Sequence, residues 1–150
     1  MILNTGNEVL IAAIIAPLMA QALKLMFYYV KNRKINFRIF TGTGGMPSSH
    51  SATVCAMTMS VGLINGFSST NFAISLVFAL IVMYDAAGLR RAAGKMAAQL
   101  NYLVDSMYEQ RPFMFKDKLM ELLGHTPLEV FMGATLGASF AFSYHFWLLN

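Results

Sequence analysis

The apolar stretch VLIAAIIAPLMAQALKLMFYYV, residues 9–30, decides which kind of fold this 150-residue chain can adopt. A helix needs about 20 mostly apolar residues to cross the hydrocarbon core of a bilayer, and only Pro17, Gln21 and Lys24 interrupt this stretch. Three further stretches qualify or nearly qualify, at residues 51–67, 72–87 and 128–149. The pattern predicts an all-α integral membrane bundle with about four transmembrane helices.

The composition favours the same class. Hydrophobic residues make up 57% of the chain and charged residues 12%, whereas a soluble domain carries roughly twice that charged fraction. The single cysteine, Cys55, forms no disulfide within the chain, and the length fits one domain, residues 1–150. The net charge of +4 points to anionic lipid or phosphate as partner rather than to nucleic acid.

The positive charges indicate how such a bundle is oriented. Four crossings place the loops 31–49 and 89–126 on one side, and both chain ends with the uncharged turn 65–70 on the other. All 11 Lys and Arg residues then lie on or near the first side, which the positive-inside rule assigns to the cytoplasm. Cations gathered to bind a ligand would produce the same bias. We expect a multi-pass protein of the cell membrane with both termini outside.

An amphipathic segment, residues 89–108, follows the third apolar stretch. Its apolar residues recur at alternating intervals of four and three, which places them on one helical face. These residues are Leu89, Ala93, Met96, Leu100, Leu103 and Met107. The stripe predicts a helix on the membrane surface or against the bundle. A homodimer contact is the alternative, because four short spans make a thin scaffold.

The segment TGGMPSSHSA, residues 43–52, combines a glycine pair, a proline, two serines and a histidine just where a span begins. Glycines let consecutive N–H groups converge on an anion. Ser48 or Ser49 is a good N-cap, and a helix start offers N–H groups and a positive dipole end. His50 could then donate a proton to the leaving oxygen of a bound phosphate. The alternative, a simple helix start, explains the proline and the serines but not the histidine.

A second polar cluster, LLGHTPLE at residues 122–129, begins the last span. Thr126, Pro127 and Glu129 form a capping-box pattern, which is one reading of Glu129. In the other reading Glu129 accepts the ring N–H of His125 and leaves the second ring nitrogen to attack phosphorus. We expect that one conformation of Glu129 cannot fully serve both roles, and the sequence does not decide between them.

These motifs resemble a known enzyme family. PSSHSA (47–52) and GHTPLE (124–129) are similar to the second and third signature motifs of type-2 phosphatidic acid phosphatases, which are related to bacterial acid phosphatases and vanadium-dependent haloperoxidases. With GGM (44–46), YDAAG (84–88) and LN (100–101), the chain resembles the divergent, short branch of that superfamily over residues 21–137. The resemblance implies a reduced version of the six-helix core, completed by a second copy in a homodimer.

The resemblance also implies roles for individual residues. His125 resembles the nucleophile that forms a phosphohistidine, His50 the acid that protonates the leaving alkoxide, and Glu129 stands where the family has an aspartate that orients the nucleophile. The backbone around Ser48 and Ser49 would hold phosphoryl oxygens. No metal or other cofactor is implied, because Lys and Arg neutralise the phosphate.

The chain departs from the family in its phosphate-binding cations. The family pairs a Lys with an Arg-Pro seven residues on, but here Lys24 is followed at that distance by Lys31 and then Asn32. Leu119 replaces the Arg expected six residues before the nucleophile. Lys24 either binds the ligand or extends to the headgroups, and Asp85 is either functional or an ion-pair partner. The candidate phosphate-binding residues are Lys24, Lys31, Arg38, Gly45, Ser48, Ser49, Asp85, Arg90, Arg91 and Lys118.

The predicted function is therefore that of a metal-independent phosphomonoesterase acting on a lipid phosphate. Phosphatidate and phosphatidylglycerophosphate are the expected substrates, because both are made at the cytoplasmic face. A non-catalytic binder or scaffold is the alternative, which the missing arginines favour. The third histidine, His145, lies near Trp147 at the outer end of the last span and is expected to be an interfacial residue.

Overall fold

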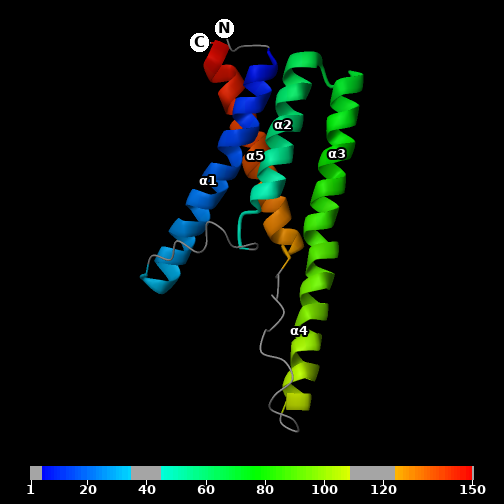
Figure 1. Cartoon of the computed structure of the whole chain (residues 1–150). Coiled ribbons are helices and arrows are strands. Elements are labelled where there is room, and N and C mark those ends of the chain that lie inside the picture. The colour runs from blue at the N-terminus through cyan, green and yellow to red at the C-terminus, as the bar shows by residue number, and fades with distance from the viewer. Residues whose placement is uncertain (1–4, 35–44, 109–123, 150) are drawn as a thin grey trace.

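The computed structural model describes residues 5–34, 45–108 and 124–149, and in these ranges the chain is helical without a strand (Figure 1). The helices begin and end within three residues of the predicted stretches. They are α1 (Gly6–Asn32), α2 (Ser49–Asn65), α3 (Thr70–Ala87), α4 (Leu89–Tyr108) and α5 (Pro127–Leu149). The predicted all-α membrane bundle is thus confirmed. The predicted site residues Arg38 and Lys118 lie outside the described residues.

Local sequence signals set the helix ends. The Ser48 hydroxyl accepts the N–H of Ser51 at the start of α2 at 3.4 Å, and the Ser69 hydroxyl accepts the N–H of Phe72 at the start of α3 at 3.2 Å. Each serine satisfies an N–H group that has no partner within its helix. Helix α1 ends at Asn32, and the residue that caps it, Arg33, has a φ of 53° in the left-handed region.

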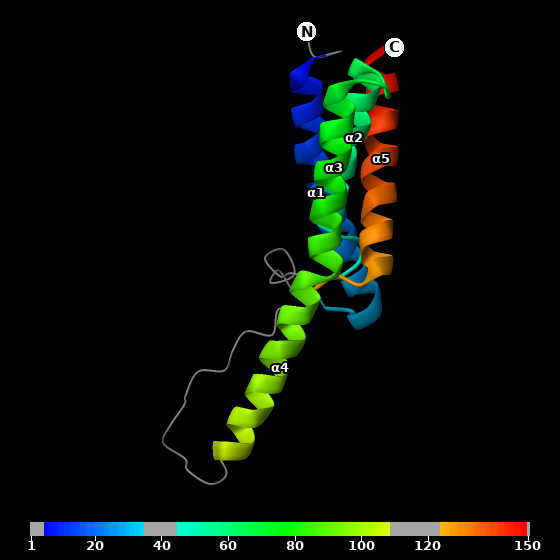
Figure 2. The same ribbon diagram turned by 90° about the vertical axis from the view of Figure 1, so that its right-hand side faces the viewer.

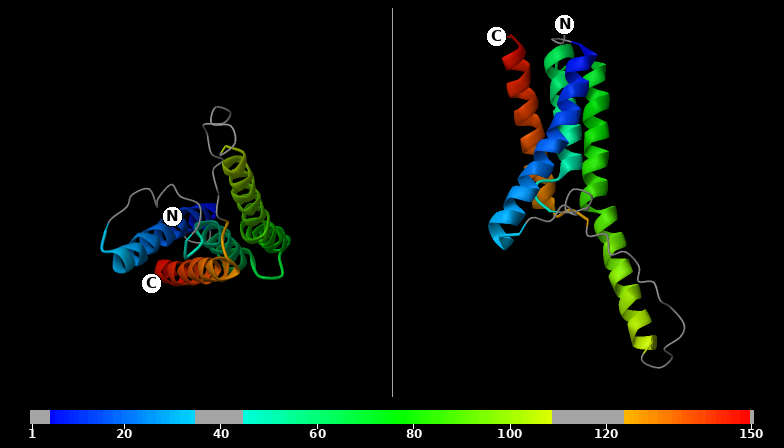
Figure 3. Two further views of the ribbon diagram at one scale, coloured as in Figure 1. Left: turned by 90° about the horizontal axis from the view of Figure 1, so that it is seen from below. Right: turned by 60° about the vertical axis from the view of Figure 1, so that its left-hand side comes forward.

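Helix α2 lies at the centre of the bundle and contacts α1, α3 and α5 (Figure 1; Figure 3, left). Helices α1 and α5 also contact each other. Both chain ends lie at the same end of the bundle, where α1 begins and α5 ends (Figure 1). The loops that carry the two histidine motifs therefore meet at the opposite end, where α2 and α5 begin.

Small residues at every fourth position let helices α1, α2 and α5 approach one another closely. On α5 a methyl group at Gly133 would overlap the carbonyl oxygen of Ser48, and one at Gly137 would overlap that of Ala52. Helices that carry glycine or alanine four residues apart commonly pack in this way in membranes. The buried core continues the pattern with Ala12, Ala16, Ala20, Ala52, Ala56 and Ala141.

Large apolar side chains lie on the outside of the bundle, the reverse of a water-soluble protein. Ile74 and Ile81 of α3 are 64% and 63% exposed, while the buried core consists mainly of alanines. Lipid is as apolar as leucine, so such a surface is stable in a bilayer but not in water. Two described helical runs, Gly6–Asn32 and Thr70–Val104, are long and apolar enough to cross a membrane.

Helix α4 continues beyond α3 after Gly88 and extends past the end of the bundle (Figure 2). Among the described helices it contacts α3 alone. Packing along the bundle, one of the two locations expected for this segment, is not what the structure shows, because α4 changes direction after α3 and runs away from the other helices (Figure 2). Met96, Leu100 and Leu103 of its apolar stripe are exposed. Location on the membrane surface and contact with a second copy stay predictions.

A buried acid–histidine pair joins the two terminal helices. Nδ1 of His145 on α5 is hydrogen-bonded to Oε1 of Glu8 on α1, 137 positions away in the chain. Glu8 is 0% exposed and His145 is 7% exposed. His145 is thus buried between α1 and α5, with a partner that the sequence did not indicate, and its location at the membrane interface stays a prediction.

Candidate active site

The two predicted catalytic histidines lie together where α2 and α5 begin. His50 is in the first turn of α2, and His125 precedes α5 by two residues. Their ring centroids are 6.1 Å apart, with the rings edge to face at 65°. The structure therefore brings the two predicted catalytic histidines together at one end of the bundle. Two helix N-termini, which favour anions, also meet at this point.

His125 is held by its backbone and by its ring. Its backbone N–H donates to the carbonyl oxygen of Ala86 at the end of α3, at 3.1 Å. Its Nδ1 lies 3.1 Å from Oε2 of Glu129. The residue is only 3% exposed. A carboxylate on one ring nitrogen sets the tautomer and the orientation of the ring.

Glu129 caps α5 and contacts His125 in one conformation. Its Oε2 accepts the backbone N–H of Thr126 at 3.1 Å, and its own backbone N–H donates to Oγ1 of Thr126 at 3.3 Å. These reciprocal bonds are the capping box that the sequence indicated. The same oxygen is the one that meets Nδ1 of His125. The expectation that one conformation cannot serve both roles was wrong, because a carboxylate oxygen has room for two donors.

Ser48 ties the two histidine motifs together. Its backbone N–H donates to the carbonyl oxygen of Glu129 at 2.9 Å, and its hydroxyl caps α2. The residue is fully buried. The Ser48 N–H thus has a different partner from the phosphoryl oxygen that we predicted for it. Ser49, the first residue of α2, is half-buried beside His50, and its role as a phosphate ligand stays a prediction.

Lys24 reaches the site from α1. The residue is 4% exposed, and its ammonium interacts electrostatically with Glu129. A Cβ on Gly45, whose φ is +83°, would lie 3.9 Å from Cδ of Lys24. The side chain therefore lies under the loop that precedes Ser48 instead of extending to the headgroups. Lys31 is exposed about 10 Å further along the helix axis, so the structure does not bring it to Lys24.

The remaining predicted residues lie nearby or are not described. Asp85 is half-buried in the last turn of α3, next to the Ala86 that receives the His125 N–H. Arg90 and Arg91 begin α4, and the structure does not describe their side chains. In the described ranges no three His, Cys, Asp or Glu side chains form a metal-binding group.

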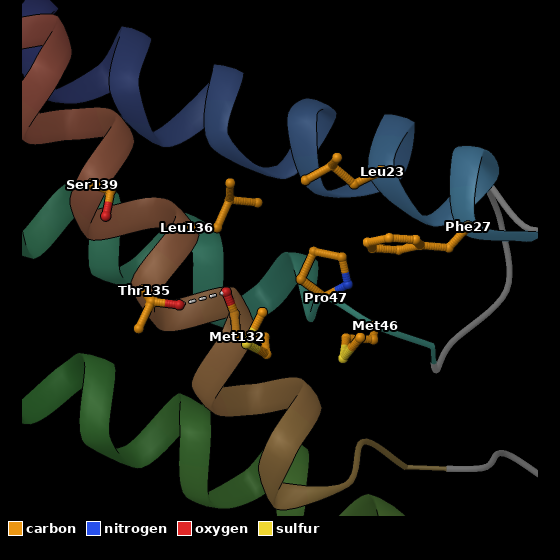
Figure 4. Close-up of a pocket in the computed structure, with 8 residues that line it drawn as sticks. All are labelled: Leu23, Phe27, Met46, Pro47, Met132, Thr135, Leu136 and Ser139. Atoms are coloured by element: carbon orange, nitrogen blue, oxygen red, sulfur yellow. Dashed lines mark hydrogen bonds between the residues drawn. The ribbon is translucent and has the colours of Figure 1, made fainter.

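An apolar groove of about 280 Å³ adjoins this cluster between α1 and α5 (Figure 4). Its lining consists of Leu23, Phe27, Met46, Pro47, Met132, Thr135, Leu136 and Ser139. Sequence reasoning missed this groove and the two glycines of α5. The spacing GATLG at residues 133–137 is the signal that could have identified the close contact between α2 and α5.

An all-helical bundle with small residues inside and large apolar residues outside is an integral membrane protein fold. The family model described as "Divergent PAP2 family" matches residues 5–140, and the chain belongs to this family. The predicted resemblance is thereby confirmed. The chain is similar to the "Uncharacterized membrane protein YuiD" of Bacillus subtilis (strain 168), with 41% identity over 141 residues, covering 87% of this chain and 89% of that protein. No solved structure matches the chain significantly.

Proposed function

We propose that this protein is a metal-independent lipid-phosphate phosphatase that acts through a phosphohistidine at His125. The observation that carries the proposal is the cluster of His50, His125 and Glu129, with ring centroids 6.1 Å apart and Nδ1 of His125 on the carboxylate. A nucleophile oriented by a carboxylate, next to a second proton-transfer group, is the arrangement that covalent catalysis requires.

The proposed reaction has two displacements. In the first, Nε2 of His125 attacks phosphorus, the bond between phosphorus and the lipid oxygen breaks, and His50 protonates the departing alkoxide. In the second, water attacks the phosphohistidine, His50 accepts the proton from that water, and the N–P bond breaks. Inorganic phosphate leaves, and His125 and His50 return to their starting protonation states.

Charge stabilisation comes from the chain itself. The Lys24 ammonium and the N-termini of α2 and α5 face the phosphoryl oxygens as negative charge develops in the transition state. Lys24 already interacts with Glu129 before substrate binds. Pre-positioned positive charge in a site with little water is worth more than the same charge in solvent.

We further propose that all four predicted spans cross the membrane and that the site faces the cytoplasm. Exposed Lys34 lies at the site end and exposed Asn65 at the end of the chain termini. Single cysteines at these positions, in a Cys55→Ala background, test this in intact cells. An impermeant maleimide should label Asn65→Cys from outside and should label Lys34→Cys only after the membrane is opened. The reverse pattern contradicts the orientation.

A non-catalytic lipid-phosphate binder is the second candidate. Two observations favour it. Exposed Lys31 lies away from buried Lys24, and the Ser48 N–H is bonded to the Glu129 carbonyl oxygen instead of to a phosphate. With fewer groups converging on a phosphate, binding without turnover is the expected result.

Turnover separates the two candidates. Purified protein in nanodiscs, with EDTA present, is incubated with phosphatidate and with phosphatidylglycerophosphate, and released phosphate is measured. The phosphatase proposal predicts release by the wild type and loss with His125→Asn. The matched control is His145→Asn, which removes the imidazole at the other end of α5 and should keep the activity below its melting temperature. Binding of both lipids without phosphate release contradicts the phosphatase proposal and supports the binder.

A further inference from the structure

We propose that the groove between α1 and α5 holds a hydrocarbon chain of the lipid whose phosphate lies at His125, and that Ser139 at its far end limits the chain length accepted. This inference rests on the proposed function, because it assigns the apolar part of the same substrate. The groove lies on the outer side of the bundle, where the bilayer would meet it.

The lining chemistry selects an apolar occupant. Leu23 and Phe27 of α1 face Met132 and Leu136 of α5 across the groove (Figure 4). The Thr135 hydroxyl, one of the few polar groups there, already donates to the carbonyl oxygen of Met132 at 3.0 Å. A lining that is mostly apolar side chains, with the Thr135 hydroxyl already bonded, favours a chain of methylenes over a headgroup or a peptide backbone.

The groove adjoins the candidate active site, because two of its lining residues are chain neighbours of residues at that site. Pro47 lines its near end and precedes Ser48, whose N–H is bonded to the Glu129 carbonyl. Leu23, which also lines the groove, directly precedes Lys24 in the chain. Lys24 interacts with Glu129. A single amphiphile can therefore place its phosphate beside Lys24 and His125 while its chain enters the groove. The charged end of such a molecule would then lie at the polar cluster, and its apolar end would lie at the apolar groove.

The size of the groove fits part of one chain. Its volume of about 280 Å³ is roughly twice that of an engineered apolar cavity that binds benzene. Ser139 lies ten residues after Glu129 on α5, which is about 15 Å along the helix axis. The chain is already in apolar surroundings in the bilayer, so contact of its methylenes with the groove walls is what favours the bound position. The position of the far wall therefore decides which chain length fits.

Photo-crosslinking tests where the chain lies without requiring catalysis. The probe is a phosphonate analogue of phosphatidate that cannot be hydrolysed and that carries a diazirine in the middle of one acyl chain. In nanodiscs it should label α1 around Leu23 and Phe27 and α5 around Leu136 and Ser139, and excess phosphatidate should remove this labelling. The matching diacylglycerol probe, which lacks the phosphorus group, should not concentrate there. Equal labelling of the exposed α3 face around Ile74 and Ile81 would overturn the proposal.

Chain-length preference tests the role of Ser139. Ser139→Phe fills the far end of the groove, and the matched control Ser143→Phe adds the same ring one turn later, at an exposed position outside the lining. Ser139→Phe should lower kcat/KM for phosphatidate with 16-carbon chains at least tenfold and leave the value for 6-carbon chains within twofold. Ser143→Phe should change neither. An equal loss for both chain lengths would overturn the chain-length role.

The two experiments separate the groove from the catalytic proposal. Labelling of the groove in a protein that releases no phosphate supports the groove and contradicts the phosphatase. Phosphate release together with an unlabelled groove supports the phosphatase and overturns the groove.

Discussion

The backbone N–H of Ser48 donates to the carbonyl oxygen of Glu129 at 2.9 Å. This bond joins the first turn of α5 to the residue that caps α2. His50 follows Ser48 by two residues and His125 precedes Glu129 by four, so the bond fixes the two histidines relative to each other. Gly133 makes the approach possible, because any side chain there would overlap the Ser48 carbonyl. The candidate active site therefore depends on helix packing as much as on its polar residues.

The contact between α2 and α5 should not tolerate a methyl group at Gly133. We expect Gly133→Ala to destabilise the bundle by about 1–3 kcal/mol and to lower activity by moving His50 away from His125. Thermal unfolding in detergent and the phosphatase assay measure the two effects. Gly6→Ala is the matched control, because a Cβ there meets nothing within 4 Å. Wild-type stability and activity in Gly133→Ala would contradict the close packing.

Two substitutions of Glu129 should separate its contribution to the stability of the bundle from its contribution to catalysis. Glu129→Gln keeps a capping-box partner for Thr126 but loses the negative charge beside His125. We expect activity to fall by about 10²–10⁴-fold, as when an orienting carboxylate is replaced by an amide, while the melting temperature stays near that of the wild type. Glu129→Ala should lose the activity and also about 0.5–2 kcal/mol of stability. If Glu129→Gln keeps full activity, Glu129 is a cap alone.

The two lysines of α1 should differ sharply. Lys24 is buried and interacts with Glu129, whereas Lys31 is exposed. A hydrogen bond to a charged group is worth about 1.5–3 kcal/mol, so Lys24→Met should lower kcat/KM about 10- to 100-fold. Lys31→Met removes the same charge from the same helix and should change kcat/KM less than threefold. Equal losses in the two variants would show that both lysines reach the phosphate.

The pair of Glu8 and His145 should contribute to stability and not to chemistry. Removing one partner leaves a buried polar group without its counterpart, so Glu8→Ala should cost about 3–5 kcal/mol. Adding His145→Ala should cost less than it does alone, with a coupling of about 1 kcal/mol or more. The pair lies about 30 Å from His125 along α5, so kcat below the melting temperature should be unchanged. Additive losses would contradict the coupling.

The sequence predicted what depends on local pattern. Apolar stretches and capping residues gave the helix bounds, because these signals lie within a few residues of each helix end. Two predicted spans separate His50 from His125, so the sequence also predicted that both histidines lie at the same end of the bundle. Lys31 was grouped with Lys24 by spacing alone, but α1 continues to Asn32 as a regular helix, which carries Lys31 away.

Contacts between distant residues could not be read from the sequence. Nothing near Glu8 indicates that its partner is 137 positions away, and nothing near Ser48 indicates that its N–H meets Glu129. The GATLG spacing of α5 was readable, but it does not tell which helix packs on it. The groove follows from the same packing, since its walls come from α1, α5 and the segment before α2.

Trapping the phosphorylated enzyme tests the nucleophile directly. The protein is mixed with ³²P-labelled p-nitrophenyl phosphate, whose leaving group needs no acid, and is quenched in alkali, where phosphohistidine survives. Label located by mass spectrometry should lie on His125, should increase in His50→Ala because hydrolysis lacks its base, and should be absent from His125→Asn. Turnover without label in any variant, or label that remains in His125→Asn, would contradict His125 as the nucleophile.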